Sequence, residues 1–146
     1  MNCVGNENNT EPTFEICNNC SPCKSINKGN FLDVIEVDAA SRTGVDGIRE
    51  IIDAVMYSPN NARFKVYIID EVHMLSNAAF NALLKTLEEP PENVKFIFAT
   101  TEIKKIPATI ISRCQRFDLQ RVDIDTLRSH LSKICESENI KFENDS

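Results

Sequence analysis

Several features that mark whole classes of protein are missing from this 146-residue sequence. It has only four glycines, and none of them precedes a Lys-Ser or Lys-Thr pair, so it contains no phosphate-binding loop of the form G-x-x-x-x-G-K-[ST]. No stretch approaches the ~18 apolar residues that a membrane helix needs, and no signal peptide opens the chain. We therefore expect a cytoplasmic protein without a membrane partner.

An excess of basic charge is missing too. The net charge of −6 argues against a general affinity for nucleic acids, although a local basic face remains compatible with it. Hydrophobic residues make up 42% of the chain and charged residues 26%, as in ordinary globular proteins. The length is enough for one domain with a hydrophobic core, and fragments of larger proteins also have this length.

The chain divides into three regions by composition. Residues 1–30 are polar, rich in cysteine and irregular, which indicates a separate N-terminal module. Residues 31–122 alternate apolar runs with amphipathic segments, and residues 123–146 form a third region. The patterns predict strands over 31–37, 65–69, 94–100 and 116–119, and helices within 43–59, 77–91, 107–114 and 122–140.

Strands that alternate with helices predict an α/β fold: a parallel sheet flanked by helices, with both faces covered. Thr43 and Asp46 are spaced as a capping box at the start of the first of these helices. In the last helix we expect apolar side chains to point inward, namely Leu127, Leu131 and Ile134.

The strand at 65–69 runs directly into two acids, Asp70 and Glu71. Ligands of open parallel sheets bind beyond the carboxyl ends of the strands, where this pair would lie. One carboxylate there suits Mg²⁺, and its neighbour suits the orientation or deprotonation of a water molecule. The alternative is that the strand simply ends in surface acids, because so short a motif often matches by chance.

Four of the six cysteines form a cluster in the N-terminal module: Cys3, Cys17, Cys20 and Cys23. Two tight C-x-x-C steps and four thiolates suit a tetrahedral Zn²⁺, and disulfides are disfavoured in a reducing cytosol. An iron–sulfur site is the alternative, but a ferredoxin pattern would place a fourth cysteine shortly downstream, before a proline. No cysteine stands there, so zinc is the prediction.

Further stretches extend the pattern: ATT at 99–101 ends the next strand, and SRC at 112–114 follows a short helix. Joined by LLKTLEEPPENVKFIF, and together with IIDEVH, they closely resemble the gamma/tau family of bacterial clamp-loader ATPases, which are subunits of DNA polymerase III. The resemblance runs from Met1 to about Ile140 and implies an AAA+ P-loop NTPase fold over residues 31–122. It also implies that a helical region begins at 123–146.

The resemblance implies ATP hydrolysis coupled to loading a sliding clamp on primed DNA, together with other clamp-loader subunits. Asp70 matches the Mg²⁺ acid and Glu71 the catalytic base of the Walker B motif, while Thr100 or Thr101 matches the γ-phosphate sensor. Arg113 matches a finger that reaches the ATP of a neighbouring subunit. The family also carries a structural zinc at the four cysteines. No catalytic role follows for His73.

Four basic residues match positions that face DNA in the family, namely Arg42, Arg49, Lys85 and Lys105. Phosphate contacts of this kind give affinity without reading sequence. Scattered basic residues on a solvated surface are the simpler interpretation.

Two alternatives remain open beside the ATPase. The related delta-prime subunit shares LLKTLEEPP, SRC and the cysteines, and it donates an arginine without hydrolysing ATP, although its Walker B site is typically degraded. In the resemblance, the chain starts after the Walker A lysine and stops before the later domains. This indicates an internal fragment or the product of a broken gene, which binds ATP poorly by itself.

Overall fold

The computed structural model describes residues 1–5, 11–41 and 44–140. They form two compact units, residues 1–115 and residues 116–146, which are treated separately below. The predicted cap at Thr43 and the predicted DNA contact at Arg42 lie outside the described residues.

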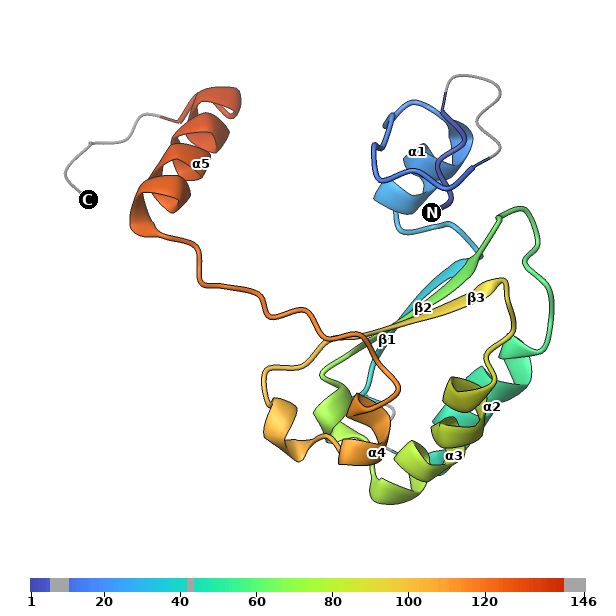
Figure 1. Cartoon of the computed structure of the whole chain (residues 1–146). Coiled ribbons are helices and arrows are strands. Elements are labelled where there is room, and N and C mark those ends of the chain that lie inside the picture. Colours follow the sequence, from blue (N-terminus) through green and yellow to red (C-terminus); the bar gives the residue numbers. More distant parts are fainter. Residues whose placement is uncertain (6–10, 42–43, 141–146) are drawn as a thin grey trace. The chain divides into compact units, whose positions relative to one another are not determined.

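The first unit is built on a three-stranded parallel sheet (Figure 1). Its strands are β1 (Val34–Asp38), β2 (Lys65–Asp70) and β3 (Val94–Phe98), in the order β1-β2-β3. The central strand is buried almost throughout, as expected where both edges are paired. The predicted α/β class is confirmed. The first strand begins three residues later than predicted, and every other strand end lies within two residues of its predicted position.

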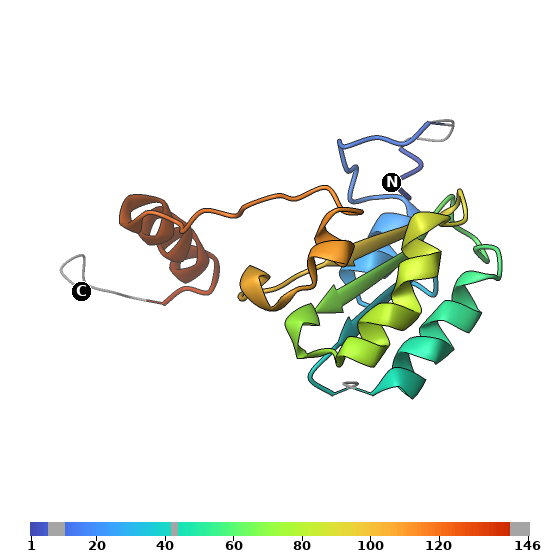
Figure 2. The same cartoon turned by 60° about the horizontal axis from the view of Figure 1, so that its bottom comes forward.

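Helices α2 (Val45–Val55) and α3 (Asn77–Glu88) lie side by side on one face of this sheet (Figure 2). Their apolar stripes meet Val37, Tyr67 and Ile69 in a single core. Helix α3 begins where Ser76 accepts a hydrogen bond from the Ala79 amide, as an N-cap does. Helix α2 instead has Gly44 as its N-cap, without a side-chain cap.

The opposite face of the sheet is less covered. By the alternation of side chains along strands, this face carries Val66 and Ile68 of β2 and Ile97 of β3. Val66 is buried and Ile68 half-buried, but Ile97 is 41% exposed. In the described part of the chain, the expectation of cover on both faces therefore holds fully for one face and in part for the other.

The cysteine-rich module belongs to the same unit and is not wholly irregular. It contains helix α1 (Ser21–Asn27), which follows Cys20 and has a proline in its first turn. Proline is common at the start of helices, but this helix was not predicted. The Asn2 side chain donates to the Phe64 carbonyl at 2.8 Å and accepts from the Phe64 amide at 3.0 Å. This pair of hydrogen bonds ties the module to the start of β2.

Short helical turns follow β2 and β3. The 3₁₀ turn η1 (Val72–Met74) comes directly after the acids, and η2 (Ile103–Lys105) precedes helix α4 (Ala108–Ile111). Buried Ile106 and Ile110 anchor the η2–α4 segment in the core. The predicted short helix within 107–114 is therefore present.

The second unit contains helix α5 (Ile124–Ser137), capped by Asp123, whose carboxylate accepts from the Thr126 amide at 2.8 Å. Residues 116–119 form no strand, because no other strand pairs with them in the described chain and an extended segment needs such a partner for its backbone. The predicted strand there is wrong.

The apolar stripe of α5 is not buried either. Leu127, Leu131 and Ile134 are each 43–51% exposed, so the second unit taken by itself does not provide the predicted inward packing. No helix of the described residues is long and apolar enough to span a membrane.

Candidate functional site

Acidic side chains gather where β1 and β2 end. Asp38 and Asp70 are register partners on neighbouring parallel strands, and the Ala39 amide donates to the Asp70 carbonyl at 3.0 Å. Both carboxylates are exposed and turn one oxygen back on the chain: Asp38 accepts from the Ala40 amide, and Asp70 from the Glu71 amide at 2.8 Å. Two neighbouring carboxylates at a strand edge suit a hydrated divalent cation such as Mg²⁺.

Glu71 leaves the strand direction at this edge. Its backbone lies in the left-handed region (φ 45°), which non-glycine residues seldom adopt and which often occurs at functional sites. The turn carries its side chain toward the end of β3, where the Thr101 hydroxyl donates to Oε2 at 3.2 Å. A carboxylate and a hydroxyl from two strand ends thus share one site.

The two candidate threonines differ in their partners. The Thr100 hydroxyl oxygen accepts from the Glu102 amide at 3.0 Å and lies 2.9 Å from Nδ1 of His73, so neighbouring groups occupy it. Thr101 is exposed, and its hydroxyl contacts Glu71 directly. Only the tertiary structure distinguishes the contacts of these adjacent residues.

Arg113 follows α4 and contacts its own chain. One of its guanidinium nitrogens pairs with Glu88 at the end of α3, and another donates to the Thr109 carbonyl at 2.6 Å. The side chain is 32% exposed, so it is oriented by these partners and still accessible.

The described basic residues of the predicted DNA face lie on three different elements. Arg49 of α2 pairs with Asp46, and Lys105 of η2 pairs with Glu102 at 2.7 Å. Lys85 lies exposed on α3. Because two of the three cations already have acidic partners, the structure adds little to the prediction of a DNA face.

The four clustered cysteines converge in space. Their Sγ atoms all lie within 4.8 Å of one another, and those of Cys17 and Cys23 are 4.0 Å apart. A tetrahedral zinc bound at about 2.3 Å separates its sulfur ligands by roughly 3.8 Å, so this cluster fits such an ion with small movements. The cluster therefore has the donor set and the size of a metal site; the identity of the metal stays a prediction.

Hydrogen bonds and burial act on these thiols in opposite directions. Backbone amides of Cys23 and Val4 lower the pKa of Cys20 to about 6, and the Cys17 amide lowers the pKa of Cys3. Burial raises the pKa of Cys23 to about 12. A bound cation would favour the thiolate form of all four residues, which is the form that binds metal.

Three groups at these sites were missed by sequence reasoning: Asp38, Glu88 and Glu102. Asp38 had a signal, since it follows an apolar strand just as Asp70 does. Glu88 and Glu102 meet Arg113 and His73 through contacts between distant elements, which no local pattern reports.

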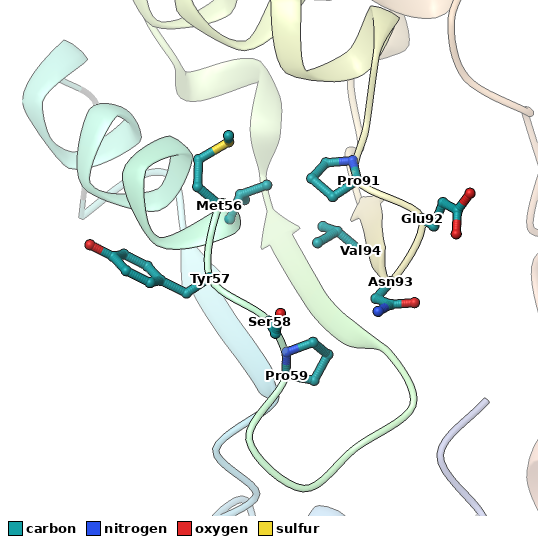
Figure 3. Close-up of a pocket in the computed structure, with 9 residues that line it drawn as sticks. Met56, Tyr57, Ser58, Pro59, Pro91, Glu92, Asn93 and Val94 are labelled. Atoms are coloured by element: carbon teal, nitrogen blue, oxygen red, sulfur yellow. The ribbon is translucent and has the colours of Figure 1, made fainter.

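A shallow hollow of about 90 Å³ lies between the end of α2 and the turn that precedes β3 (Figure 3). Its lining includes Pro59 and Pro91, and Figure 3 shows the Tyr57 ring pointing away from it. It adjoins Val94, at the end of β3 opposite to the acids, and is smaller than most ligand sites. We assign no function to it.

Solved structures define the class of fold. A DNA polymerase III gamma-subunit-related protein from Thermotoga maritima is 32% identical, with a TM-score of 0.61, and the match covers 72% of this chain and 36% of that one. A Thermotoga maritima RuvB variant also has a TM-score of 0.61, at 14% identity, over 75% of this chain and 37% of that one. The first unit therefore has the fold of an AAA+ P-loop domain.

Sequence comparison then gives the family. The model of the family described as "DNA polymerase III, delta subunit" matches residues 1–123, so the chain belongs to this family. Curated relatives within it carry gamma/tau names, as the sequence resemblance indicated. DNA polymerase III subunit tau/gamma of Haemophilus influenzae is 58% identical over 87% of this chain, and subunit tau of Bacillus subtilis is 58% identical over 90%. The chain spans only 18% and 23% of the length of these relatives.

Proposed function

We propose that this chain supplies the Mg²⁺- and water-handling side of a clamp-loader ATPase site in DNA replication. The observation that carries the proposal is the joining of Glu71 and Thr101 across two strand ends, beside Asp70, in a chain that is 58% identical to a tau subunit. The phosphate-binding loop would come from outside the printed sequence. In the intact complex the partners are other clamp-loader subunits, the sliding clamp and primed DNA, in the cytoplasm.

Each side chain has a defined role in this proposal. Asp70 would hold the Mg²⁺ that accompanies ATP, and a cation bound there would supply positive charge beside the phosphates. Glu71 orients the attacking water and accepts its proton. Thr101, rather than Thr100, senses the γ-phosphate, because its hydroxyl is exposed beside Glu71 while that of Thr100 is engaged with His73 and the Glu102 amide.

Arg113 is proposed as the finger that enters the neighbouring subunit's ATP site. Glu88 and the Thr109 carbonyl orient it in the isolated chain. Because this role needs no nucleotide in its own subunit, a non-catalytic scaffold like delta-prime could also perform it. The four cysteines hold a structural Zn²⁺, and Arg49, Lys85 and Lys105 remain weaker candidates for DNA phosphate contacts.

The test is a chimaera in which residues 1–123 replace the matching segment of the Bacillus subtilis tau subunit. We expect Glu71→Gln to lower kcat for ATP hydrolysis by about 10²–10⁴, because an amide cannot accept the proton of water. ATP affinity should change little. Glu92→Gln, at the opposite end of β3, is the matched control and should hydrolyse at the normal rate. Normal hydrolysis by Glu71→Gln would overturn the proposal.

A further inference from the structure

His73 is a buried imidazole among polar groups. Its side chain is only 7% exposed, although it lies in η1 immediately beyond the exposed edge of the sheet. Nδ1 lies 2.9 Å from the Thr100 hydroxyl and 3.1 Å from Oε2 of Glu71, and Nε2 lies 3.5 Å from Oε1 of Glu102. One ring therefore contacts residues of three segments: the turn after β2, the end of β3 and the start of η2.

The tautomer of His73 decides which atoms donate here. Nδ1 forms a hydrogen bond with the Thr100 hydroxyl, in which either group can donate, and it also lies 3.1 Å from Oε2 of Glu71. An ionised carboxylate can only accept hydrogen bonds, so this approach favours the tautomer with a proton on Nδ1, facing both Glu71 and the Thr100 oxygen, which also accepts from the Glu102 amide. Nε2 faces Glu102, whose pKa is lowered chiefly by its hydrogen bond from Lys105.

Both contacts to Glu71 fall on one carboxylate oxygen. Thr101 and His73 each approach Oε2, at 3.2 and 3.1 Å. Among the described residues no hydrogen bond or ion pair involves Oε1, so this oxygen is available to a water molecule. The Thr101 hydrogen bond and the approach of His73 to Oε2 restrict the rotation of a carboxylate that is otherwise 38% exposed.

We infer that His73 is a positioning residue for Glu71. Its Nδ1–H holds Oε2, and its ring links Glu71 to Thr100 and Glu102, so that the strand end and the sensor segment move together. The inference rests on the proposed function of Glu71 as the base. In this role His73 acts through Glu71, by keeping its carboxylate in the orientation that accepts a proton.

The first test reads the ring itself in the 146-residue chain. The sequence has two histidines, and the other, His130, is exposed on α5, so it serves as an internal control. Long-range ¹⁵N–¹H NMR spectra should show a proton on Nδ1 of His73, and its signals should move in Glu71→Ala while those of His130 stay in place. A neutral ring protonated only at Nε2, or signals indifferent to Glu71→Ala, would overturn the inference.

The second test uses the chimaera and two isosteric substitutions. Asparagine places an N–H near the position of Nδ1, whereas glutamine places one near Nε2, so His73→Asn preserves the proposed contact and His73→Gln removes it. We expect His73→Gln to lower kcat about 10- to 100-fold, the usual range for residues that orient a catalytic group, without raising KM for ATP. His73→Asn should recover most of kcat, and Glu92→Gln, the control already defined for the chimaera, should match the wild type.

The outcomes separate this inference from the proposed function. If Glu71→Gln is inactive and His73→Gln turns over normally, the positioning role is wrong and the base assignment stands. If His73→Asn is as slow as His73→Gln, while both melt at the same temperature, the ring matters only for packing and the inference also fails. If Glu71→Gln hydrolyses ATP normally, the proposed function itself fails, and the NMR result still reports the His73 contact.

Discussion

The cysteine cluster and the edge of the sheet are assembled in different ways. Three of the four cysteines stand at two-residue steps between Cys17 and Cys23, so the ligand set is nearly complete within one short stretch of chain. The edge joins Glu71 to Thr101, 30 residues further on, through two parallel strands. The first site follows from local spacing, whereas the second requires the fold.

The difference predicts how each site fails. A metal site made of neighbouring residues loses its ligand geometry when one ligand is lost, because the chain around it has little other reason to be ordered. An edge site on a buried sheet keeps its backbone when a side chain is changed, because the core supports it. Substitutions should therefore alter structure at the cluster and activity at the edge.

The largest effect is expected at the cluster. Purified protein should contain close to one zinc per chain, and Cys20→Ser should lose it together with the order of residues 11–30, since structural zinc contributes about 10–16 kcal/mol in small zinc domains. Elemental analysis and amide NMR spectra measure both. Cys135→Ser on α5 is the control and should keep the metal. Iron with labile sulfide in place of zinc would contradict the prediction.

The second-largest effect is expected for substitutions of Arg113. The measurement uses a complex in which the chimaera adjoins a subunit with an intact ATP site, and it follows ATP hydrolysis at that neighbouring site. Arg113→Ala should slow the neighbour's hydrolysis by about 10³–10⁵, the range for arginine fingers, while its ATP affinity persists. Arg113→Lys should also be slow, because lysine lacks the planar fork. Arg116→Lys is the control, since Arg116 pairs with Asp118 on the surface. A normal rate in Arg113→Ala would leave only a surface ion pair with Glu88.

The smallest effect is expected at the N-cap of α5, where Asp123 contacts Thr126, three residues further along the chain. The Thr126 amide holds the pKa of Asp123 below its ordinary value. A pKa lowered by folding stabilises the helix above the unfolded value, and this stabilisation is lost as pH falls through the folded value. The protection factor of the Thr126 amide, which is the intrinsic exchange rate at each pH divided by the observed rate, should therefore fall as the pH is lowered through the folded value.

The matched variant for this effect is Asp123→Asn, which keeps an acceptor at the cap but does not titrate. Its Thr126 amide should show no such change over the same acidic range. Equal pH responses in the two proteins would show that the cap is not the cause.

Local patterns predicted much of the first unit. The run before Asp70 is buried at the centre of the sheet, and the apolar spacing of Phe80, Leu83 and Leu87 placed α3. These elements were predictable because side-chain periodicity reflects which face is buried. Residues 116–119 have the same kind of apolar pattern but form no strand, and Leu127 of α5 is exposed. An apolar pattern indicates that a segment is suited to packing against a partner, but it does not show whether that partner is present.

By itself the sequence determined the family, the α/β class, the group of four clustered cysteines and the acids that end β2, because each depends on short stretches of sequence. Only the tertiary structure decided that Asp38 stands beside Asp70, that Thr101 meets Glu71, that His73 is buried between two glutamates and that Arg113 rests on Glu88. The contacts that join separate elements link residues that are 25 to 32 positions apart in the sequence. Parallel strands bring their carboxyl ends to one edge, and only that convergence sets which side chains meet there.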